Sequence, residues 1–238
     1  MLILASSSWT LRPLLAQHPK TLARFYNGMN APRILIITTA TLAEGREVDK
    51  EKIAFWKQSP DTRIELCDLR EATRNPLVTE DGLKAWDMVI LLGGNTFALL
   101  ESIQRVDALC KGGFSYTLGV MAKSQATAVI GESAGACVFG ADIAHLADAD
   151  DPSVVTSSLN TKGLNLLPYA IVPHIGCPFY GLGDASQSVL NWIVKQDPKD
   201  WKHSALCIHE AEAQIWFENL NGTSRRLWLE NGLDGVTP

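Results

Sequence analysis

The chain has 238 residues, of which 46% are hydrophobic and 20% are charged, and its formal net charge is −5. This composition is ordinary for a soluble globular protein, and the acidic balance argues against a nucleic acid as partner. No apolar run approaches the roughly 20 residues that span a bilayer, and no basic residue precedes the apolar start. We therefore expect no membrane contact and no secretory signal, and the length predicts a single domain over residues 1–238.

The five cysteines form an odd set without a C-x-x-C pair. They stand at Cys67, Cys110, Cys137, Cys177 and Cys207. Such a set is typical of free thiols in a reducing compartment, because disulfide scaffolds use paired cysteines. We therefore expect a cytoplasmic protein.

The first part of the chain alternates short apolar runs with longer segments of helical periodicity. Strands are predicted at residues 2–6, 33–40, 63–69, 88–94 and 127–133. Helices are predicted between them, at residues 11–27, 50–59, 96–113 and 116–125. The apolar runs look like strands buried on both faces, as expected where helices cover both faces of a sheet. The alternation predicts an α/β fold, a three-layer sandwich in which helices flank a mostly parallel sheet.

After Gly140 the pattern changes. An acidic loop at residues 141–153 leads to a strand at 169–174, in the same sheet, and to a helix at 185–196. Three further strands are predicted, at residues 204–210, 213–219 and 224–232. They resemble a meander that closes the edge of the sheet, so we expect antiparallel strands near the C-terminus.

The segment Gly131-Glu132-Ser133-Ala134-Gly135 places one serine between two glycines, directly after a buried strand. A Gly-rich turn also serves tight packing between a strand and a helix. In the G-x-S-x-G arrangement, however, a strained turn holds the serine oxygen clear of the backbone, and the following N–H groups can bind an oxyanion. Ser133 is therefore a candidate nucleophile.

A second polar motif follows the strand at residues 88–94. Gly93 and Gly94 end this strand, and Asn95 or Thr96 can cap the next helix. The motif is a good strand-to-helix connection, but a glycine N–H also admits close approach by an oxyanion. Ligands bind beyond the carboxyl ends of parallel strands, where this turn and the serine turn meet.

A serine hydroxyl becomes a useful nucleophile when a histidine takes its proton and an acid orients that histidine. Two histidines, His174 and His209, stand at the ends of predicted strands, and Glu210 follows as a candidate acid. The other histidines lie in polar or acidic segments: His18, His145 and His203. His174 is the better partner for Ser133, because it ends an apolar strand that follows the serine turn.

Three motifs occur in order along the chain: Gly93-Gly94-Asn95-Thr96-Phe97, Gly131-Glu132-Ser133-Ala134-Gly135-Ala136 and Pro173-His174. Together they resemble the peptidase E family of serine peptidases, which includes aspartyl dipeptidases and is related to the cyanophycinases. The resemblance implies a dipeptidase-like enzyme that hydrolyses small peptides through an acyl-enzyme. It implies no cofactor and no metal. Whether the protein forms a homodimer is left open.

The resemblance also implies a role for each site residue. Ser133 would be the nucleophile, and His174 the general base and then the general acid. The N–H groups of Gly94 and Ala134 would form the oxyanion hole. The side chains of Asn95 and Thr96 would contact the substrate.

The third member of the triad has more than one candidate. Glu210 matches the late glutamate proposed in the family, whereas Asp148 matches the spacing of an aspartate proposed about fifteen residues after the serine. Asp150 better matches the local D-x-P pattern. We prefer Glu210, because a strand end holds an imidazole more rigidly than an acidic loop does.

The chain departs from aspartyl dipeptidases in the segments that follow Ser133 and His174, since neither contains Arg or Lys. A substrate carboxylate in a partly dry pocket needs a positioned cation. More apolar residues stand there instead: Cys177, Phe179 and Tyr180. We therefore expect no preference for an N-terminal Asp, unless Lys162 or Arg225 reaches the site from a distant segment.

Two other function classes stay open. An α/β-hydrolase esterase also carries G-x-S-x-G, with its histidine near the C-terminus and its acid before it. The histidine would then be His203 or His209, and the acid Asp184 or Asp197. A non-catalytic binding protein of peptidase-like fold is the second alternative.

Overall fold

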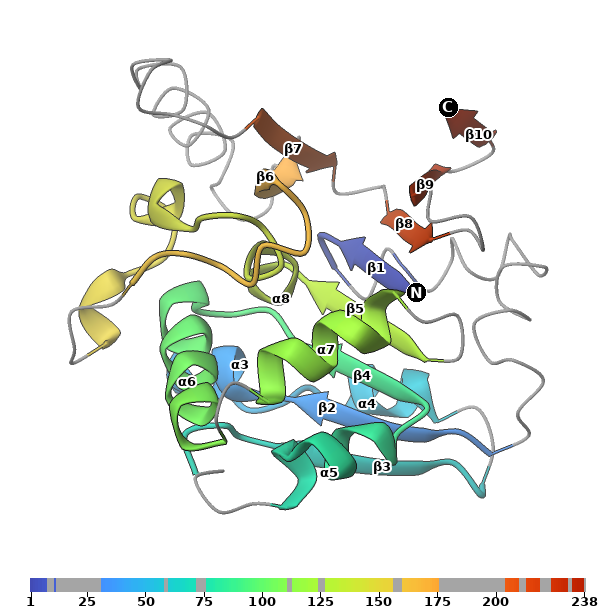
Figure 1. The fold of residues 1–238 in the computed structure, drawn as a ribbon, viewed down its shortest axis with the longest axis vertical. Helices are drawn as coiled ribbons and strands as arrows, with labels where there is room; N and C mark the ends of the chain where they lie inside the picture. Colours follow the sequence, from blue (N-terminus) through green and yellow to red (C-terminus); the bar gives the residue numbers. More distant parts are fainter. Residues whose placement is uncertain are drawn as a thin grey trace.

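In a computed structural model of the chain (Figure 1), the described residues are 1–7, 11, 31–57, 60–71, 76–110, 113–123, 127–155, 160–175, 204–209, 213–218, 224–230 and 233–237. Two predicted helices, at residues 11–27 and 185–196, lie almost wholly outside this part of the chain.

The main sheet runs through the centre of the fold. Among the described residues it has eight strands, in the order β10-β9-β8-β1-β5-β4-β2-β3. Their bounds are β1 Leu2–Ala5, β2 Arg33–Ile37, β3 Arg63–Cys67, β4 Met88–Leu91, β5 Ala128–Glu132, β8 Ala213–Glu218, β9 Ser224–Glu230 and β10 Leu233–Thr237. Five neighbouring strands are parallel: β1, β5, β4, β2 and β3. Beyond β1, the strands β8, β9 and β10 extend the sheet in antiparallel fashion. The predicted fold class is confirmed.

Helices and single turns of 3₁₀ helix connect these strands. Their bounds are α3 Thr39–Ala43, α4 Lys50–Trp56, η1 Pro76–Val78, α5 Glu80–Lys84, α6 Thr96–Leu109, α7 Gly113–Lys123, α8 Ala134–Cys137, η2 Ala144–Leu146 and η3 Pro152–Val154. Four begin at a capping side chain (Asp49, Thr79, Asn95 and Asp151); in α6, for example, Asn95 accepts the N–H of Ala98. Within the described segments, each helix is too short or too polar to cross a membrane.

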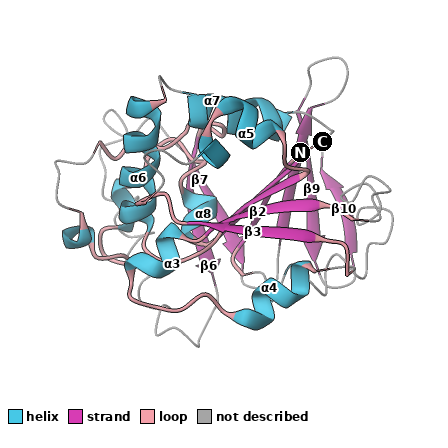
Figure 2. Ribbon diagram, turned by 90° about the horizontal axis from the view of Figure 1, so that it is seen from below, coloured by secondary structure: helices cyan, strands magenta, loops and turns pink. Residues whose placement is uncertain are grey.

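Side chains of the parallel strands alternate between two apolar layers, because successive residues of a strand point to opposite faces. In β2, Leu35 and Ile37 pack into the core that contains α5, α6 and α7, whereas Ile34 and Ile36 pack with Trp56 of α4. Figure 2 shows α5 and α7 on one side of the strands and α4 on the other. The sheet is therefore the middle layer of the sandwich.

The strand that carries His174 lies outside the main sheet. β6 (Tyr169–Ile175) and β7 (Ser204–His209) form a separate parallel pair, which packs on the core side of α6 and α7. The prediction was wrong in placing the strand at 169–174 in the main sheet and the strand at 204–210 in the antiparallel meander. An apolar pattern specifies a strand, but contacts between distant segments select its partner.

Smaller differences concern the bounds of elements and additional short elements. The apolar run at residues 33–40 ends as a strand at Ile37, and α3 begins at Thr39, whose hydroxyl accepts the N–H of Leu69 at 2.8 Å. That tertiary contact outweighs the β propensity of the threonines. The acidic loop contains the short turns η2 and η3, and β10 is an additional strand.

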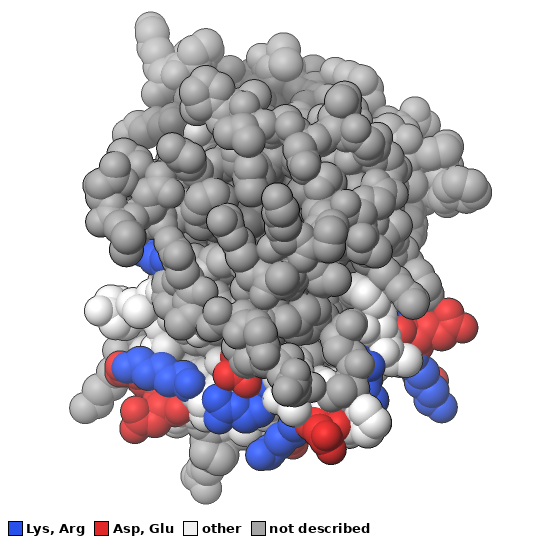
Figure 3. Space-filling view, turned by 90° about the vertical axis from the view of Figure 1, so that its right-hand side faces the viewer, with Lys and Arg blue, Asp and Glu red and all other residues white. Residues whose placement is uncertain are grey.

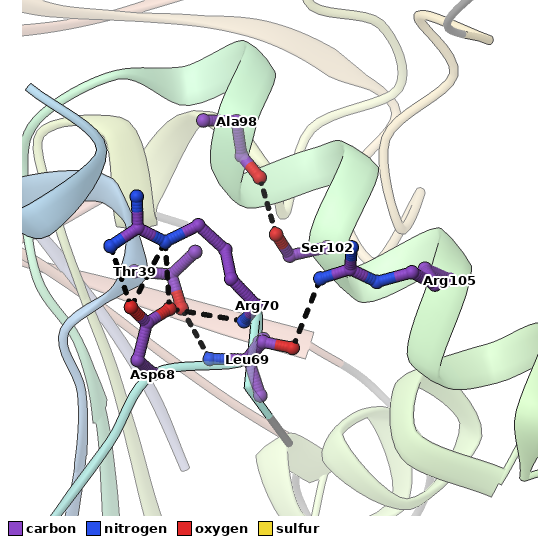
Figure 4. Close-up of polar contacts among 7 residues, drawn as sticks. All are labelled: Thr39, Asp68, Leu69, Arg70, Ala98, Ser102 and Arg105. Carbon is purple, nitrogen blue, oxygen red and sulfur yellow. Dashed lines mark hydrogen bonds and ion pairs between the residues drawn. The ribbon is translucent and has the colours of Figure 1, made fainter. Parts of the chain in front are cut away.

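Polar contacts hold α6 against the end of β3, as Figure 4 shows. The hydroxyl of Thr39 and the guanidinium of Arg105 both bind Leu69, the former at its N–H and the latter at its carbonyl oxygen (3.3 Å). Arg70 closes the same turn by pairing with Asp68 at 2.7 Å. The Gly93-Gly94 turn that precedes α6 has its own contact, since the hydroxyl of Thr41 donates to the carbonyl oxygen of Gly93 at 2.6 Å.

The four cysteines in the described part of the chain are free thiols, whereas Cys177 lies outside it. On the face in Figure 3, Lys and Arg side chains alternate with Asp and Glu over the described residues. No large patch of one sign gathers among those residues. The described charges on this face therefore do not indicate a ligand, and we look for one from the charges inside the fold.

Candidate active site

Ser133 lies in a strained turn between β5 and α8. Its φ of 52° and ψ of −113° are backbone angles that residues other than glycine rarely adopt. Gly135 lets the turn pack closely, since a Cβ at this position would lie 2.1 Å from the carbonyl oxygen of Leu91. The N–H of Ser133 donates to the carbonyl oxygen of Ala5 at 2.9 Å, at the end of β1. This is the geometry of a nucleophile elbow.

The imidazole of His174 lies against the hydroxyl of Ser133, with 2.8 Å between Nε2 and Oγ. His174 has a φ of 62°, and the pairing of β6 with β7 is irregular between Val172 and Ile175. A bulge of this kind redirects one side chain of a strand. The irregular backbone thus turns His174 toward Ser133, although the two residues come from different sheets.

Ser6 is a residue of this site that the sequence motifs did not reveal. Its hydroxyl accepts the backbone N–H of His174 at 2.9 Å and donates to the carbonyl oxygen of Ile208 at 3.1 Å. It therefore links the end of β1 to both strands of the small sheet at the bulge. The available signal was its place as the first polar residue after an apolar strand.

We expect Ser6→Ala to lower kcat by about tenfold to a hundredfold, because a small displacement of a catalytic group is costly. The free energy of unfolding falls by about 1–3 kcal/mol, since the N–H of His174 loses its acceptor. Steady-state kinetics and denaturant titration measure the two effects. Ser102→Ala is the matched control, because this buried hydroxyl donates only within α6, to the carbonyl oxygen of Ala98. An unchanged kcat in Ser6→Ala would contradict the role of Ser6 at the bulge.

Two backbone N–H groups, those of Gly94 and Ala134, lie on the same cavity as Ser133. Neither has a hydrogen-bond partner among the described residues. Gly94 has a φ of 137°, and a Cβ there would lie 2.3 Å from the backbone of Ala40, so only glycine fits. Both N–H groups are available to an oxyanion.

Asn95 and Thr96 differ in their relation to the cavity. The side chain of Asn95 is buried, caps α6 through the N–H of Ala98 and donates to the carbonyl oxygen of Asp151 at 2.9 Å. It does not line the cavity, and these contacts give it a structural role; its contact with substrate stays a prediction. Thr96 does line the cavity, and its N–H donates to Asp150 at 2.8 Å.

Of the two aspartates proposed to orient His174, the structure brings only Asp150 to the cavity. Burial raises the pKa of Asp150, and the hydrogen bond from Thr96 and the positive charge of a protonated His174 oppose that rise. Asp150 is thus within electrostatic reach of His174. Asp148 is exposed and does not line the cavity.

Glu210, the preferred acid, lies outside the described residues. The residue before it, His209, pairs with Ile175 in the small sheet, next to His174. His209, the last described residue of β7, therefore lies close to the His174 bulge.

The cavity has a volume of about 460 Å³ and opens at the carboxyl ends of the parallel strands. Two cations line it, Arg46 before α4 and Lys52 within α4. Neither was predicted as a site residue, because both stand far from the three motifs in the sequence. Lys162 instead pairs with Asp142 at 2.6 Å and does not line the cavity. The side chain of Arg225 lies outside the described residues.

The residues required by the esterase alternative lie outside the described part of the chain: His203, Asp184, Asp197 and the side chain of His209. The apolar residues expected after His174 lie outside it too: Cys177, Phe179 and Tyr180.

Comparison with known proteins agrees with the fold and the motifs. The sequence model of Peptidase family S51 matches residues 1–199. "Uncharacterized peptidase Lin0382" of Listeria innocua serovar 6a is 26% identical over 193 residues, which cover 79% of this chain and 82% of that protein. "Uncharacterized peptidase Lmo0363" of Listeria monocytogenes serovar 1/2a is 26% identical over 150 residues, covering 63% and 69%.

A crystal structure of a protein from Listeria monocytogenes EGD-e, assigned to peptidase E, has the same fold. The TM-score is 0.63 at 24% sequence identity, over 90% of this chain and 92% of that one. The family match covers the strained serine turn, the glycine turn and the strand that carries His174, and it favours a peptidase over an esterase or a non-catalytic binding protein. The chain therefore belongs to peptidase family S51 and is a peptidase.

Proposed function

We propose that the protein is a serine peptidase that hydrolyses small peptides, in the manner of a dipeptidase. The observation that carries the proposal is the contact of 2.8 Å between His174 Nε2 and Ser133 Oγ, at a cavity with two available N–H donors. A cavity of about 460 Å³ suits a ligand of a few residues. The free thiols support a cytoplasmic location.

In the proposed reaction, Ser133 Oγ attacks the carbonyl carbon of the scissile bond while His174 Nε2 takes its proton. The N–H groups of Gly94 and Ala134 bind the oxyanion of the tetrahedral intermediate. His174 then gives the proton to the leaving amine as the C–N bond breaks. Water, deprotonated by His174, hydrolyses the acyl-enzyme and restores the Ser133 hydroxyl.

A panel of unmodified dipeptides tests this function. We expect turnover, with kcat/KM for Asp-Leu no higher than for Asn-Leu and Leu-Leu, because Arg46 and Lys52 are already paired with Glu44 and Glu132. A neutral fluorophosphonate labels Ser133 in the same preparation, as peptide mapping by mass spectrometry shows. Absence of labelling in the folded protein would contradict a serine mechanism. A clear preference for Asp would instead make Arg46 the next residue to replace.

The identity of the orienting acid is tested by two isosteric variants. We expect Glu210→Gln to lower kcat by about 10⁴-fold, because the amide no longer holds the imidazole in the required tautomer. Asp150→Asn lowers kcat less than about tenfold, since we place this residue outside the triad.

Stability gives a second readout for Asp150. Its pKa is raised by burial, so it contributes stability below the usual carboxylate range and loses that contribution as pH rises through its folded value. Asp150→Asn is therefore expected to raise Tm at pH 7. A large loss of kcat in Asp150→Asn, together with an active Glu210→Gln, would make Asp150 the orienting acid.

A further inference from the structure

Glu132 places a buried carboxylate directly beside Ser133. It is the last residue of β5, its side chain is only 5% exposed, and it lies on the cavity. One of its oxygens, Oε1, pairs with the ammonium of Lys52. The other, Oε2, is buried and has no hydrogen-bond partner within the described residues. A carboxylate accepts several hydrogen bonds, and an unused buried oxygen is costly.

The charges around Glu132 favour a cation. The described charged residues on the cavity wall comprise five acids and two bases: Glu44, Glu47, Asp49, Glu132 and Asp150 against Arg46 and Lys52. Both bases are already engaged, Arg46 with Glu44 and Lys52 with Glu132. The remaining acids leave an excess of negative charge, which attracts cations and repels carboxylates.

We propose that the carboxylate of Glu132 binds an alkylammonium group of the substrate and thereby determines specificity. Lys52 occupies one of its oxygens, Oε1, and competes with the substrate for the charge of the carboxylate. This inference rests on the proposed function only in taking a peptide as the ligand.

Two substrate groups carry this chemistry, the α-ammonium of a free N-terminus and the side chain of lysine. In a dipeptide the α-nitrogen is two bonds from the carbonyl carbon that Ser133 attacks. The Cα atoms of Glu132 and Ser133 are neighbours in the chain and therefore about 3.8 Å apart. Glu132 can thus bind the α-ammonium while Ser133 attacks the carbonyl carbon. The short reach favours the α-ammonium, and the experiment separates the two sources.

Equilibrium binding tests the inference without turnover. Calorimetry at pH 7 on the Ser133→Ala background compares Leu-Leu, N-acetyl-Leu-Leu and N-acetyl-Lys-Leu. We expect Leu-Leu to bind at least about tenfold more tightly than N-acetyl-Leu-Leu, because acetylation removes a charge-assisted hydrogen bond to Glu132. Adding Glu132→Gln abolishes this preference. Tighter binding of N-acetyl-Lys-Leu than of N-acetyl-Leu-Leu would assign the site to a side-chain ammonium.

Three further variants on the same background separate recognition from structure. Lys52→Met frees Oε1 and removes a competing cation, so we expect it to tighten binding of Leu-Leu. Glu47→Gln also removes one negative charge from the cavity wall, but not the proposed acceptor. We expect at least half of the preference for Leu-Leu over N-acetyl-Leu-Leu to remain in this variant. Glu132→Ala checks the loss of preference should Glu132→Gln fold poorly, and thermal melts establish folding of each variant.

Several results would overturn the inference. The first is equal binding of Leu-Leu and both acetylated peptides to Ser133→Ala. The second is a preference for Leu-Leu over N-acetyl-Leu-Leu that survives in Glu132→Gln. The third is an equal weakening of Leu-Leu binding by Lys52→Met and by Glu132→Gln. The last result would mean that the pair only holds α4 against the sheet. Failure of the serine mechanism appears separately, as absence of fluorophosphonate labelling in the protein with Ser133 intact.

Discussion

Ser133→Ala is expected to lower kcat for dipeptide hydrolysis by about 10⁶-fold, the effect of removing the nucleophile from a serine peptidase. The variant keeps the cavity and the N–H groups of Gly94 and Ala134, so KM changes little. Rates are measured with a continuous assay for the released amino acid, and fluorophosphonate labelling is lost in parallel. A Ser133→Ala protein that retains more than a few per cent of wild-type kcat would contradict a covalent mechanism.

Ser133→Gly separates loss of chemistry from loss of structure. Glycine adopts a φ of 52° and a ψ of −113° at lower cost than serine does. Relief of that strain, about 1–3 kcal/mol, is expected to raise Tm while activity is lost. A fall in Tm would mean that the hydroxyl contributes more to stability than the strained turn costs.

His174→Ala is the second large effect, and we expect kcat to fall by about 10⁶-fold as well. Without the imidazole at 2.8 Å, no base takes the proton of Ser133 Oγ. The double variant Ser133→Ala/His174→Ala is expected to be no slower than either single variant, because the two residues act as one unit.

The matched control for this effect is His209→Ala. His209 is the other histidine that the sequence places at a strand end, and it pairs through its backbone with Ile175. We expect kcat to stay within about tenfold of wild type. An inactive His209→Ala protein beside an active His174→Ala protein would assign the base to His209.

The parallel sheet, its helices and the order of the three motifs were predictable from the sequence. In β2, four buried apolar residues follow Arg33, and α6 shows helical periodicity after a capping asparagine. These signals are local, because the period of a segment and its cap are written in adjacent residues. The G-x-S-x-G motif likewise predicted a strained turn at Ser133 before any contact was known.

What the sequence determined by itself was therefore the set of elements and the residue types at their ends. The tertiary structure decided how they meet: it paired β6 with β7 outside the main sheet, and it set Ser6 under the His174 bulge. It also brought Arg46 and Lys52 to the cavity wall and gave Glu132 its cationic partner. The physical reason is that strand pairing, hydrogen bonds and ion pairs between distant segments depend on packing of the whole chain, which no local period or motif specifies.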